Sequence, residues 1–301
     1  KFIIYPLTLL SIFHLIFYYK KFCPDIIVSN LVGYVPNILK FFFPKLVIVN
    51  SIQGYPRFNY FRKILWKIFY NKSDYIFTMT NISKKKIKES INYQNKIFKV
   101  NNPVINRNIR ILSNLNIEKQ DQIFFNKINF CAIGRLTRQK NFIEITQAVA
   151  LLDKEYKKKF NILIIGNGEK YKEISKEINR KNLNNIFMLG FRKNPYPYLR
   201  KSDFFISTSL WEEPGHAILE AGYLNKLIIS SNCPNGPREI LINNFNALKY
   251  ESGDIQELSN ILKLIIDNKI ENEIYLKTNM KKLVKTYSKF MFAKKIQSIF
   301  S

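Results

Sequence analysis

Short apolar runs alternate with helical patterns along most of this chain, and this alternation limits the fold more than any other feature. Each run is about as long as a buried β-strand. Strands that are apolar nearly throughout are typical of parallel sheets covered by helices on both faces. The pattern therefore predicts an α/β fold. The expected strands are residues 26–29, 46–49, 75–78, 97–100, 128–133, 162–165, 186–189, 204–207 and 227–230, and the expected helices between them include 61–70, 142–152, 171–178 and 217–224.

The strands fall into two blocks, which predicts two sheets and two domains. The first domain is expected over residues 1–105, where Asn102-Pro103-Val104 closes the first block. Residues 106–122 are polar and lack an apolar period long enough for a core strand, so we interpret them as a linker. Residues 123–283 form the second domain, and residues 284–301 contain a last helical pattern. A chain of 301 residues is long enough for both domains.

The three cysteines are Cys23, Cys131 and Cys233, and they are widely scattered. Their spacing matches no paired metal-ligand motif and no disulfide framework, which favours a reduced, cytoplasmic protein. The apolar fraction of 47% and the charged fraction of 23% are those of a globular chain rather than a disordered one.

The formal net charge of +26 is unusual, since 48 Lys and Arg face only 22 Asp and Glu. Nucleic acid is not the expected partner, because no zinc-finger, RNP-type or helix-turn-helix signature is present. An anionic membrane surface is a second explanation, and a general Lys-, Asn- and Ile-rich bias is a third. Residues 2–19 carry no charged side chain and precede Lys20-Lys21. Pro6 and His14 interrupt this stretch, so a buried or membrane-surface helix is favoured over a membrane span.

Residues 203–221 combine a short apolar strand, a loop and an apolar helix. Glu212 and Glu220 lie eight positions apart around the Pro214-Gly215 turn that precedes this helix. In open α/β sheets such a unit presents backbone N–H groups to a phosphate or a sugar. Capping of the helix and complementing of its dipole are the alternative interpretation of the two carboxylates.

Three motifs in the same order resemble those of retaining, family-4-type glycosyltransferases. They are Glu212-x7-Glu220, the stretch 232–241 (Asn-Cys-Pro-Asn-Gly-Pro-Arg-Glu-Ile-Leu) and the loop 132–141 (Ala-Ile-Gly-Arg-Leu-Thr-Arg-Gln-Lys-Asn). The resemblance implies the GT-B fold, in which two Rossmann-like, doubly wound parallel-sheet domains face each other across a cleft. It also implies that the C-terminal helix, within residues 284–301, crosses back to the first domain. An ordinary first domain starts with a strand and a Gly-rich loop, so this one is expected to be incomplete.

The resemblance also assigns roles to individual residues. Arg135 and Lys140 would hold the two phosphates of a nucleotide-diphosphate sugar, and Gly134 would let the backbone approach them. Glu220 would accept hydrogen bonds from the ribose hydroxyls, and Glu212 would lie beside the donor sugar. Glu212, Arg135 and Lys140 are the expected catalytic residues, and the backbone of Gly215, His216 and Ala217 is expected to contact the donor.

Gln53 is the main departure from the family pattern. It occupies the apparent position of an acceptor-side histidine, and an amide can hydrogen-bond a sugar but cannot carry a proton. No Asp-x-Asp motif is present, so we expect no metal and no cofactor besides a UDP- or GDP-linked donor. Gly166-Asn167-Gly168 is only half of a dinucleotide fingerprint and is interpreted as a plain strand-to-helix turn.

The leading hypothesis is a retaining, metal-independent glycosyltransferase that builds a surface polysaccharide, a lipopolysaccharide or another lipid-linked glycan. An inactive transferase-like binding subunit and a nucleotide-sugar epimerase of the same fold are the alternatives. The protein is expected in the cytoplasm, with peripheral attachment of the first domain to an anionic membrane at the inner face of the plasma membrane. Three features suggest this attachment: residues 2–19, the cluster Phe41-Phe42-Phe43, and the basic residues Lys20, Lys21, Lys40, Lys45, Arg57, Arg62, Lys63 and Lys67. The further aromatic residues Trp66, Phe69 and Tyr70 suit a lipid-linked acceptor, and they are equally typical of an ordinary core.

Overall fold

The computed structural model of the protein describes residues 4–30, 34–56, 58–93 and 96–301. The chain divides into two compact units, Lys1–Asn101 and Asn102–Ser301, which we call the first and second units. Residues 2 and 3 and Arg57, which the sequence assigns to the membrane-facing set, lie outside the described residues.

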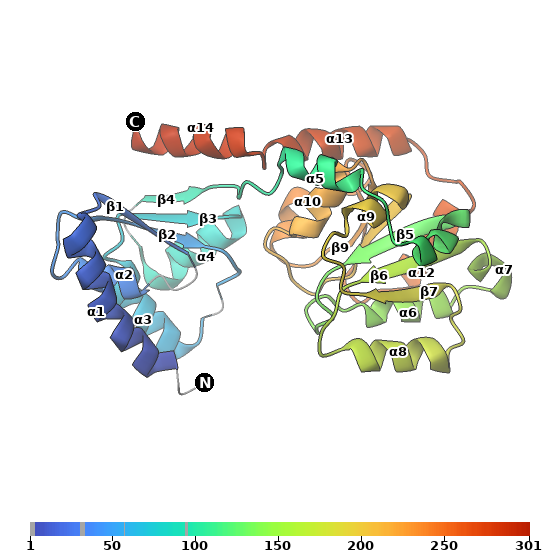
Figure 1. Cartoon of the computed structure of the whole chain (residues 1–301), viewed down its shortest axis with the longest axis horizontal. Coiled ribbons are helices and arrows are strands. Elements are labelled where there is room, and N and C mark those ends of the chain that lie inside the picture. The colour runs from blue at the N-terminus through green and yellow to red at the C-terminus, as the bar shows by residue number, and fades with distance from the viewer. Residues whose placement is uncertain (1–3, 31–33, 57, 94–95) are drawn as a thin grey trace. The chain divides into compact units, whose positions relative to one another are not determined.

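The first unit contains a four-stranded parallel sheet whose strands follow each other in chain order. Right-handed crossovers in such a sheet place the connecting helices on one face, and Figure 1 shows the helices of this unit together on one side of the sheet. Helix α1 packs beside α2, and α2 packs beside α3. The strands are β1 (Ile26–Asn30), β2 (Val47–Ile52), β3 (Tyr75–Thr78) and β4 (Lys96–Lys99), and the helices are α1 (Ile4–Phe22), α2 (Tyr34–Leu39), α3 (Tyr60–Tyr70) and α4 (Asn81–Ile91).

Two of these helices, α3 and α4, begin with a polar side chain that caps the helix N-terminus. Asn59 accepts a hydrogen bond from the Arg62 backbone N–H at the start of α3, at 2.8 Å. Thr80 accepts one from the Ser83 N–H at the start of α4, at 3.1 Å. The uncharged N-terminal stretch is helical, as expected. Among the described residues, no helix combines the length and the apolar character needed to cross a bilayer.

The second unit contains a six-stranded parallel sheet in the order β10-β9-β8-β5-β6-β7. The chain starts in the middle at β5, moves outward to β7, and then returns to build the other half from β8. This reversal makes the sheet doubly wound, with its topological switch point between β5 and β8. In the described residues the reversal occurs in this unit only. The strands are β5 (Ile128–Ile133), β6 (Phe160–Ile165), β7 (Ile186–Gly190), β8 (Phe204–Ser207), β9 (Leu227–Ser231) and β10 (Leu248–Tyr250).

Helices cover both faces of this second sheet (Figure 1), and each face has its own apolar cluster. One cluster includes α6, α8 and α12, and the other includes α5, α9, α10 and α13. The helical elements are α5 (Arg107–Ser113), the 3₁₀ helix η1 (Lys119–Asn126), α6 (Ile143–Ala150), α7 (Lys154–Lys157), α8 (Tyr171–Arg180), α9 (Tyr196–Lys201), α10 (His216–Tyr223), α11 (Gly236–Ile240), α12 (Ile255–Ile266), α13 (Glu273–Lys285) and α14 (Lys289–Phe300).

The segment 106–122, expected as a linker, is folded onto the second unit. It contains α5 and the first part of η1, and Ile109 and Ile117 are buried in the core of that unit. Of the five apolar residues in this segment only these two are buried, whereas Ile111, Leu112 and Leu115 are exposed, so the apolar positions do not mark one buried face. Strand β10 was also not expected, because three residues are too short to stand out. The C-terminal helix forms as expected, and its crossing to the first domain stays a prediction.

Candidate functional site

Loops that follow β5 and β8 meet at the carboxyl ends of these strands, where the strand order reverses. The backbone N–H of Leu210 donates to the carbonyl of Gln139 at 2.8 Å, and the Gln139 amide donates to the carbonyl of Trp211 at 2.9 Å. The Thr208 hydroxyl donates to the carbonyl of Lys140 at 2.9 Å. These hydrogen bonds fix the loop after β5 against the loop after β8, at the place where open α/β sheets bind ligands.

A third segment, at the end of β9 and in the loop that follows it, donates two hydrogen bonds to the loop after β8. The Gly236 N–H donates to the carbonyl of Glu212 at 3.0 Å, and the Ser231 hydroxyl donates to the carbonyl of Ser209 at 2.6 Å. The motif at residues 232–241 thus packs directly against the loop that carries Glu212.

Lys140 and Glu212 form an ion pair between the first two loops. Their side chains are 20% and 8% exposed, so both charges are largely removed from water. The Ser209 hydroxyl donates to the same Glu212 Oε1 atom, at 2.8 Å. A buried charge of this kind is tolerated only when it is paired and hydrogen-bonded. The sequence placed both residues at the donor but did not anticipate that they pair.

In the second unit, the glycines that follow β5 and β6 allow the backbones of these two turns to approach each other closely. A Cβ atom on Gly166 would lie 1.8 Å from the carbonyl oxygen of Gly134, a distance that no side chain can occupy. The Gly134 N–H donates to the carbonyl of Ile165 at 3.0 Å. A Cβ on Gly134 itself would lie 3.0 Å from Lys140 Cε, so the lysine side chain passes directly over this residue.

Helix α10 begins at His216, immediately after Gly215. Gly215 has a φ of 100°, in the left-handed region that glycine adopts readily. The pKa of His216 is lowered, mainly because its imidazole is partly desolvated although the residue as a whole is exposed. The nearby Glu212 carboxylate raises this pKa, and the Lys140 ammonium lowers it. Gly215 and Ala217 line a small cavity of about 10 Å³ together with Lys140 and Glu212.

Glu220 lies in α10 and accepts a hydrogen bond from the Tyr196 hydroxyl at 3.0 Å. Burial raises the pKa of Glu220, whereas the Tyr196 hydrogen bond and the Lys140 ammonium lower it. Burial and the Glu220 charge raise the pKa of Tyr196 to about 12, so this hydroxyl stays protonated and able to donate at neutral pH. Tyr196 therefore holds the Glu220 carboxylate in one orientation and favours its ionised form.

We expect Tyr196→Phe to shift the acid limb of nucleotide binding to higher pH. Removing the hydroxyl raises the pKa of Glu220 further, so the ionised carboxylate is lost at a higher pH as the solution is acidified. Calorimetric titration with UDP or GDP across a pH series measures this midpoint. Tyr223→Phe, on the same helix as Glu220, is the control, because no hydrogen bond of the Tyr223 hydroxyl is found within the described residues. An unchanged midpoint in Tyr196→Phe would contradict the role of Glu220.

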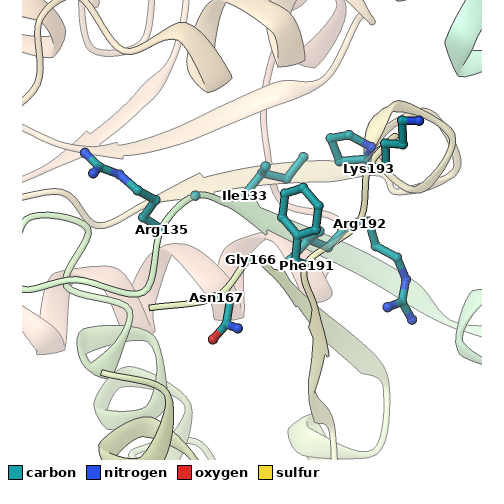
Figure 2. Close-up of a pocket in the computed structure, with 10 residues that line it drawn as sticks. Ile133, Arg135, Gly166, Asn167, Phe191, Arg192 and Lys193 are labelled. Carbon is teal, nitrogen blue, oxygen red and sulfur yellow. The ribbon is translucent and has the colours of Figure 1, made fainter. Parts of the chain in front are cut away.

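A pocket of about 610 Å³ opens at the carboxyl ends of β5, β6 and β7 (Figure 2). Its size lies within the range of small-molecule sites. Figure 2 shows the Phe191 ring between Ile133 and Arg192, with the Arg135 side chain on the opposite side. The pocket is lined by Ile133, Gly134, Arg135, Ile165, Gly166, Asn167, Phe191, Arg192, Lys193 and Pro195.

The three basic residues of this pocket differ in how their charges are compensated. Arg192 donates to Asp121 at 3.0 Å and forms an ion pair with Glu118 at 3.3 Å, so two carboxylates neutralise it. Within the described part of the chain, neither Arg135 nor Lys193 has such a partner. Arg135 and Lys193 are therefore the cations of this pocket that are available to an anionic ligand.

Arg135 and Lys140, which the sequence assigns to the two phosphates of one donor, line two cavities that share Ile133, so their joint role stays a prediction. Arg135 lines the larger pocket, whereas Lys140 lines the small cavity with Glu212. Gln53, the expected acceptor-side residue, lies in the first unit directly after β2. Its amide donates to the Ser51 hydroxyl at 2.6 Å and to Asn30 at 3.3 Å.

Phe191, Lys193 and Tyr196 were not identified from the sequence. The available signal was the position of Phe191-Arg192-Lys193 immediately after β7, which is equivalent to that of Arg135 after β5. No group of His, Cys, Asp and Glu residues suited to hold a metal ion occurs among the described residues.

Comparison with known proteins identifies relatives of the second unit and of the whole chain. The profile described as "Glycosyl transferases group 1" matches residues 114–283. An uncharacterized glycosyltransferase of Methanocaldococcus jannaschii, MJ1059, is 34% identical over 75% of this chain, which spans 60% of that protein. The UDP-Gal:alpha-D-GlcNAc-diphosphoundecaprenol alpha-1,3-galactosyltransferase of Escherichia coli is 29% identical over 58% of this chain and 46% of its own length. The structure of Anabaena HepE in complex with UDP superposes with a TM-score of 0.79, at 17% identity, over 96% of this chain and 81% of that one.

Proposed function

Because the chain belongs to the glycosyl transferases group 1 family, we propose that it transfers a sugar from a nucleotide-diphosphate sugar to a glycan acceptor. The GT-B fold expected from the motifs is confirmed by the superposed structures. The observation that carries the proposed activity is the pocket at the carboxyl ends of β5, β6 and β7, where Arg135 and Lys193 are available. The Lys140–Glu212 pair lies next to it, at the switch point between β5 and β8.

The nucleotide diphosphate would occupy this region in two parts. Arg135 would attract a phosphate at the rim of the larger pocket, where a charged hydrogen bond can form. Exposed Phe191 offers an apolar, aromatic surface for a base. The Glu220 carboxylate, which Tyr196 orients, would accept hydrogen bonds from the ribose hydroxyls.

A retaining mechanism suits the arrangement of Glu212. Glu212 Oε1 accepts hydrogen bonds from Lys140 and Ser209, so this carboxylate serves as the buried counter-charge of Lys140 rather than as an isolated base. We therefore infer that a leaving phosphate oxygen accepts the acceptor proton on the same face of the sugar, while cationic side chains stabilise the diphosphate. By analogy with the Escherichia coli relative, whose name gives a diphosphoundecaprenol-linked acceptor, the acceptor would be a lipid-linked glycan. A growing surface polysaccharide such as lipopolysaccharide stays the wider prediction from the sequence.

A screen of UDP- and GDP-linked sugars tests the activity. We expect nucleoside diphosphate release, accelerated by acceptor, to persist in excess chelator, because the proposed site holds the diphosphate with cationic side chains. Activity that is lost in chelator and restored by Mg²⁺ or Mn²⁺ would contradict this diphosphate site. NMR of the product linkage distinguishes retention from inversion.

The same screen separates the two alternatives. An epimerase would convert the sugar while the nucleotide stays attached. An inactive binding subunit would bind donor without turnover, and Gln53, which cannot act as a proton carrier, is the residue that favours this outcome.

A further inference from the structure

Helix α1 has apolar side chains on two opposite sides, and the described residues of the first unit cover only one of them. Leu15, Ile16 and Tyr19 pack against the core of the first unit, and the Tyr19 ring lies 4.0 Å from that of Phe43. On the other side Phe17 and Phe22 are 61% and 64% exposed. A helix that is apolar all round normally has a second apolar neighbour.

The exposed side of α1 is an aromatic cluster rather than a scatter of single residues. The Tyr18 ring lies 5.9 Å from that of Phe17 and 6.0 Å from that of Phe22. Lys21 lies over the Phe22 ring at 5.4 Å. Aromatic and basic side chains therefore occur together at the C-terminal end of this helix.

Helix α3 repeats the arrangement two helices away. Its inner side holds Trp66 and Tyr70, which stack at 4.1 Å in the core, so these two aromatics are not part of a membrane-facing set. Its outer side exposes Tyr60, Phe61 and Ile68.

The outer sides of α1, α2 and α3 form one layer, because α2 packs between α1 and α3 (Figure 1). The turn that follows α2 adds the exposed Phe41 and Phe42. We call this surface the α1–α3 face.

The chain segment that contains the α1–α3 face carries almost only positive charge. Residues 1–72 contain ten Lys and Arg and a single acidic residue, Asp25. Lys40 is paired with Asp74 at 2.9 Å, but Lys20, Lys63 and Lys67 are exposed. A second copy of this chain would bring like charges together, whereas an anionic surface complements them.

We propose that the α1–α3 face docks onto an anionic lipid bilayer, with its aromatic side chains at the acyl boundary and its lysines at the headgroups. Apolar insertion and attraction to anionic lipid reinforce each other in such a surface. The inference adds a partner to the proposed function. It does not depend on turnover, because vesicle binding is measured without donor or acceptor.

Co-sedimentation with vesicles tests the proposal. The protein should bind phosphatidylcholine vesicles that contain about one third phosphatidylglycerol, bind neutral vesicles poorly, and dissociate as salt rises. Phe17→Gln with Phe22→Gln should weaken binding on the order of tenfold or more. The control pair Leu264→Gln with Ile274→Gln removes exposed apolar side chains from the second unit and should leave binding unchanged.

A charge-matched comparison separates a specific face from overall charge. Lys63→Glu with Lys67→Glu and Lys281→Glu with Lys282→Glu change the net charge equally, and all four lysines are exposed. The first pair should weaken binding on the order of tenfold or more, and the second pair should weaken it little. Equal losses would mean that overall charge drives binding and would overturn the proposal.

Two further results would also overturn it. One is a protein that ignores anionic vesicles even at low salt. The other is a dimer in light scattering that Phe17→Gln with Phe22→Gln converts to monomer, which would make the face a contact between copies. If the aromatic variant does not fold, as judged by its melting curve, the lysine pairs still decide. Calorimetry with UDP on the same variants should be unchanged, so a failure of the donor site is distinguished from a failure of this face.

Discussion

Replacing Lys140 by methionine is expected to lower the free energy of unfolding by about 3 kcal/mol, because it leaves a buried carboxylate without its counter-charge. Among the described residues, the Ser209 hydroxyl would then be the hydrogen-bond donor left to the Glu212 carboxylate, whose side chain is 8% exposed. Turnover of the donor should fall by about a hundredfold or more, since a preorganised charge beside the proposed diphosphate is lost. Denaturant unfolding and steady-state kinetics measure the two effects.

The double variant Lys140→Met with Glu212→Gln serves as the control for this prediction. Removing both charges eliminates the unpaired carboxylate, so stability should recover most of the loss while turnover stays low. If Lys140→Met is as stable as the parent chain, the ion pair contributes nothing to the fold. If the double variant regains turnover, the pair has no role beyond stability.

Replacing Arg135 by alanine is expected to weaken binding of UDP or GDP by about 1.5–3 kcal/mol, roughly ten- to a hundredfold, as for a lost hydrogen bond to a charged group. Arg135 lines the larger pocket and has no ion-pair partner among the described residues, so its removal leaves no carboxylate uncompensated. The melting temperature should therefore stay unchanged, and calorimetry should record the change in affinity.

Arg138→Ala is the matched comparison for Arg135→Ala, because Arg138 is exposed on the same loop and lines a different cavity. It should leave nucleotide affinity nearly unchanged. If both substitutions weaken nucleotide binding equally, Arg135 contributes only to the overall positive potential and does not contact the phosphate.

The strands were predictable because burial on both faces demands apolar residues at nearly every position. The runs 75–78, 128–133 and 204–207 coincide with β3, β5 and β8. Elements with little buried surface escaped this reasoning. Strand β10 has three residues, and α5 contributes little beyond Ile109 to the core.

The candidate site was predictable as a set of loops but not as a set of contacts. Glycines, cations and carboxylates directly after strands mark where parallel strands end, and this depends on local sequence alone. Which side chains meet there depends on strand order. Lys140 reaches Glu212 because β5 and β8 are neighbours, although 72 positions separate the two residues in the chain.

The amino-acid sequence by itself determined that this chain builds two parallel sheets and carries glycosyltransferase motifs, because strand burial and loop chemistry are local properties. Only the tertiary structure decided that Arg192 is neutralised by Glu118 and Asp121, and that Trp66 faces a core while Phe17 faces outward. Charge compensation and burial are set by neighbours that are distant in sequence, so no local pattern contains them.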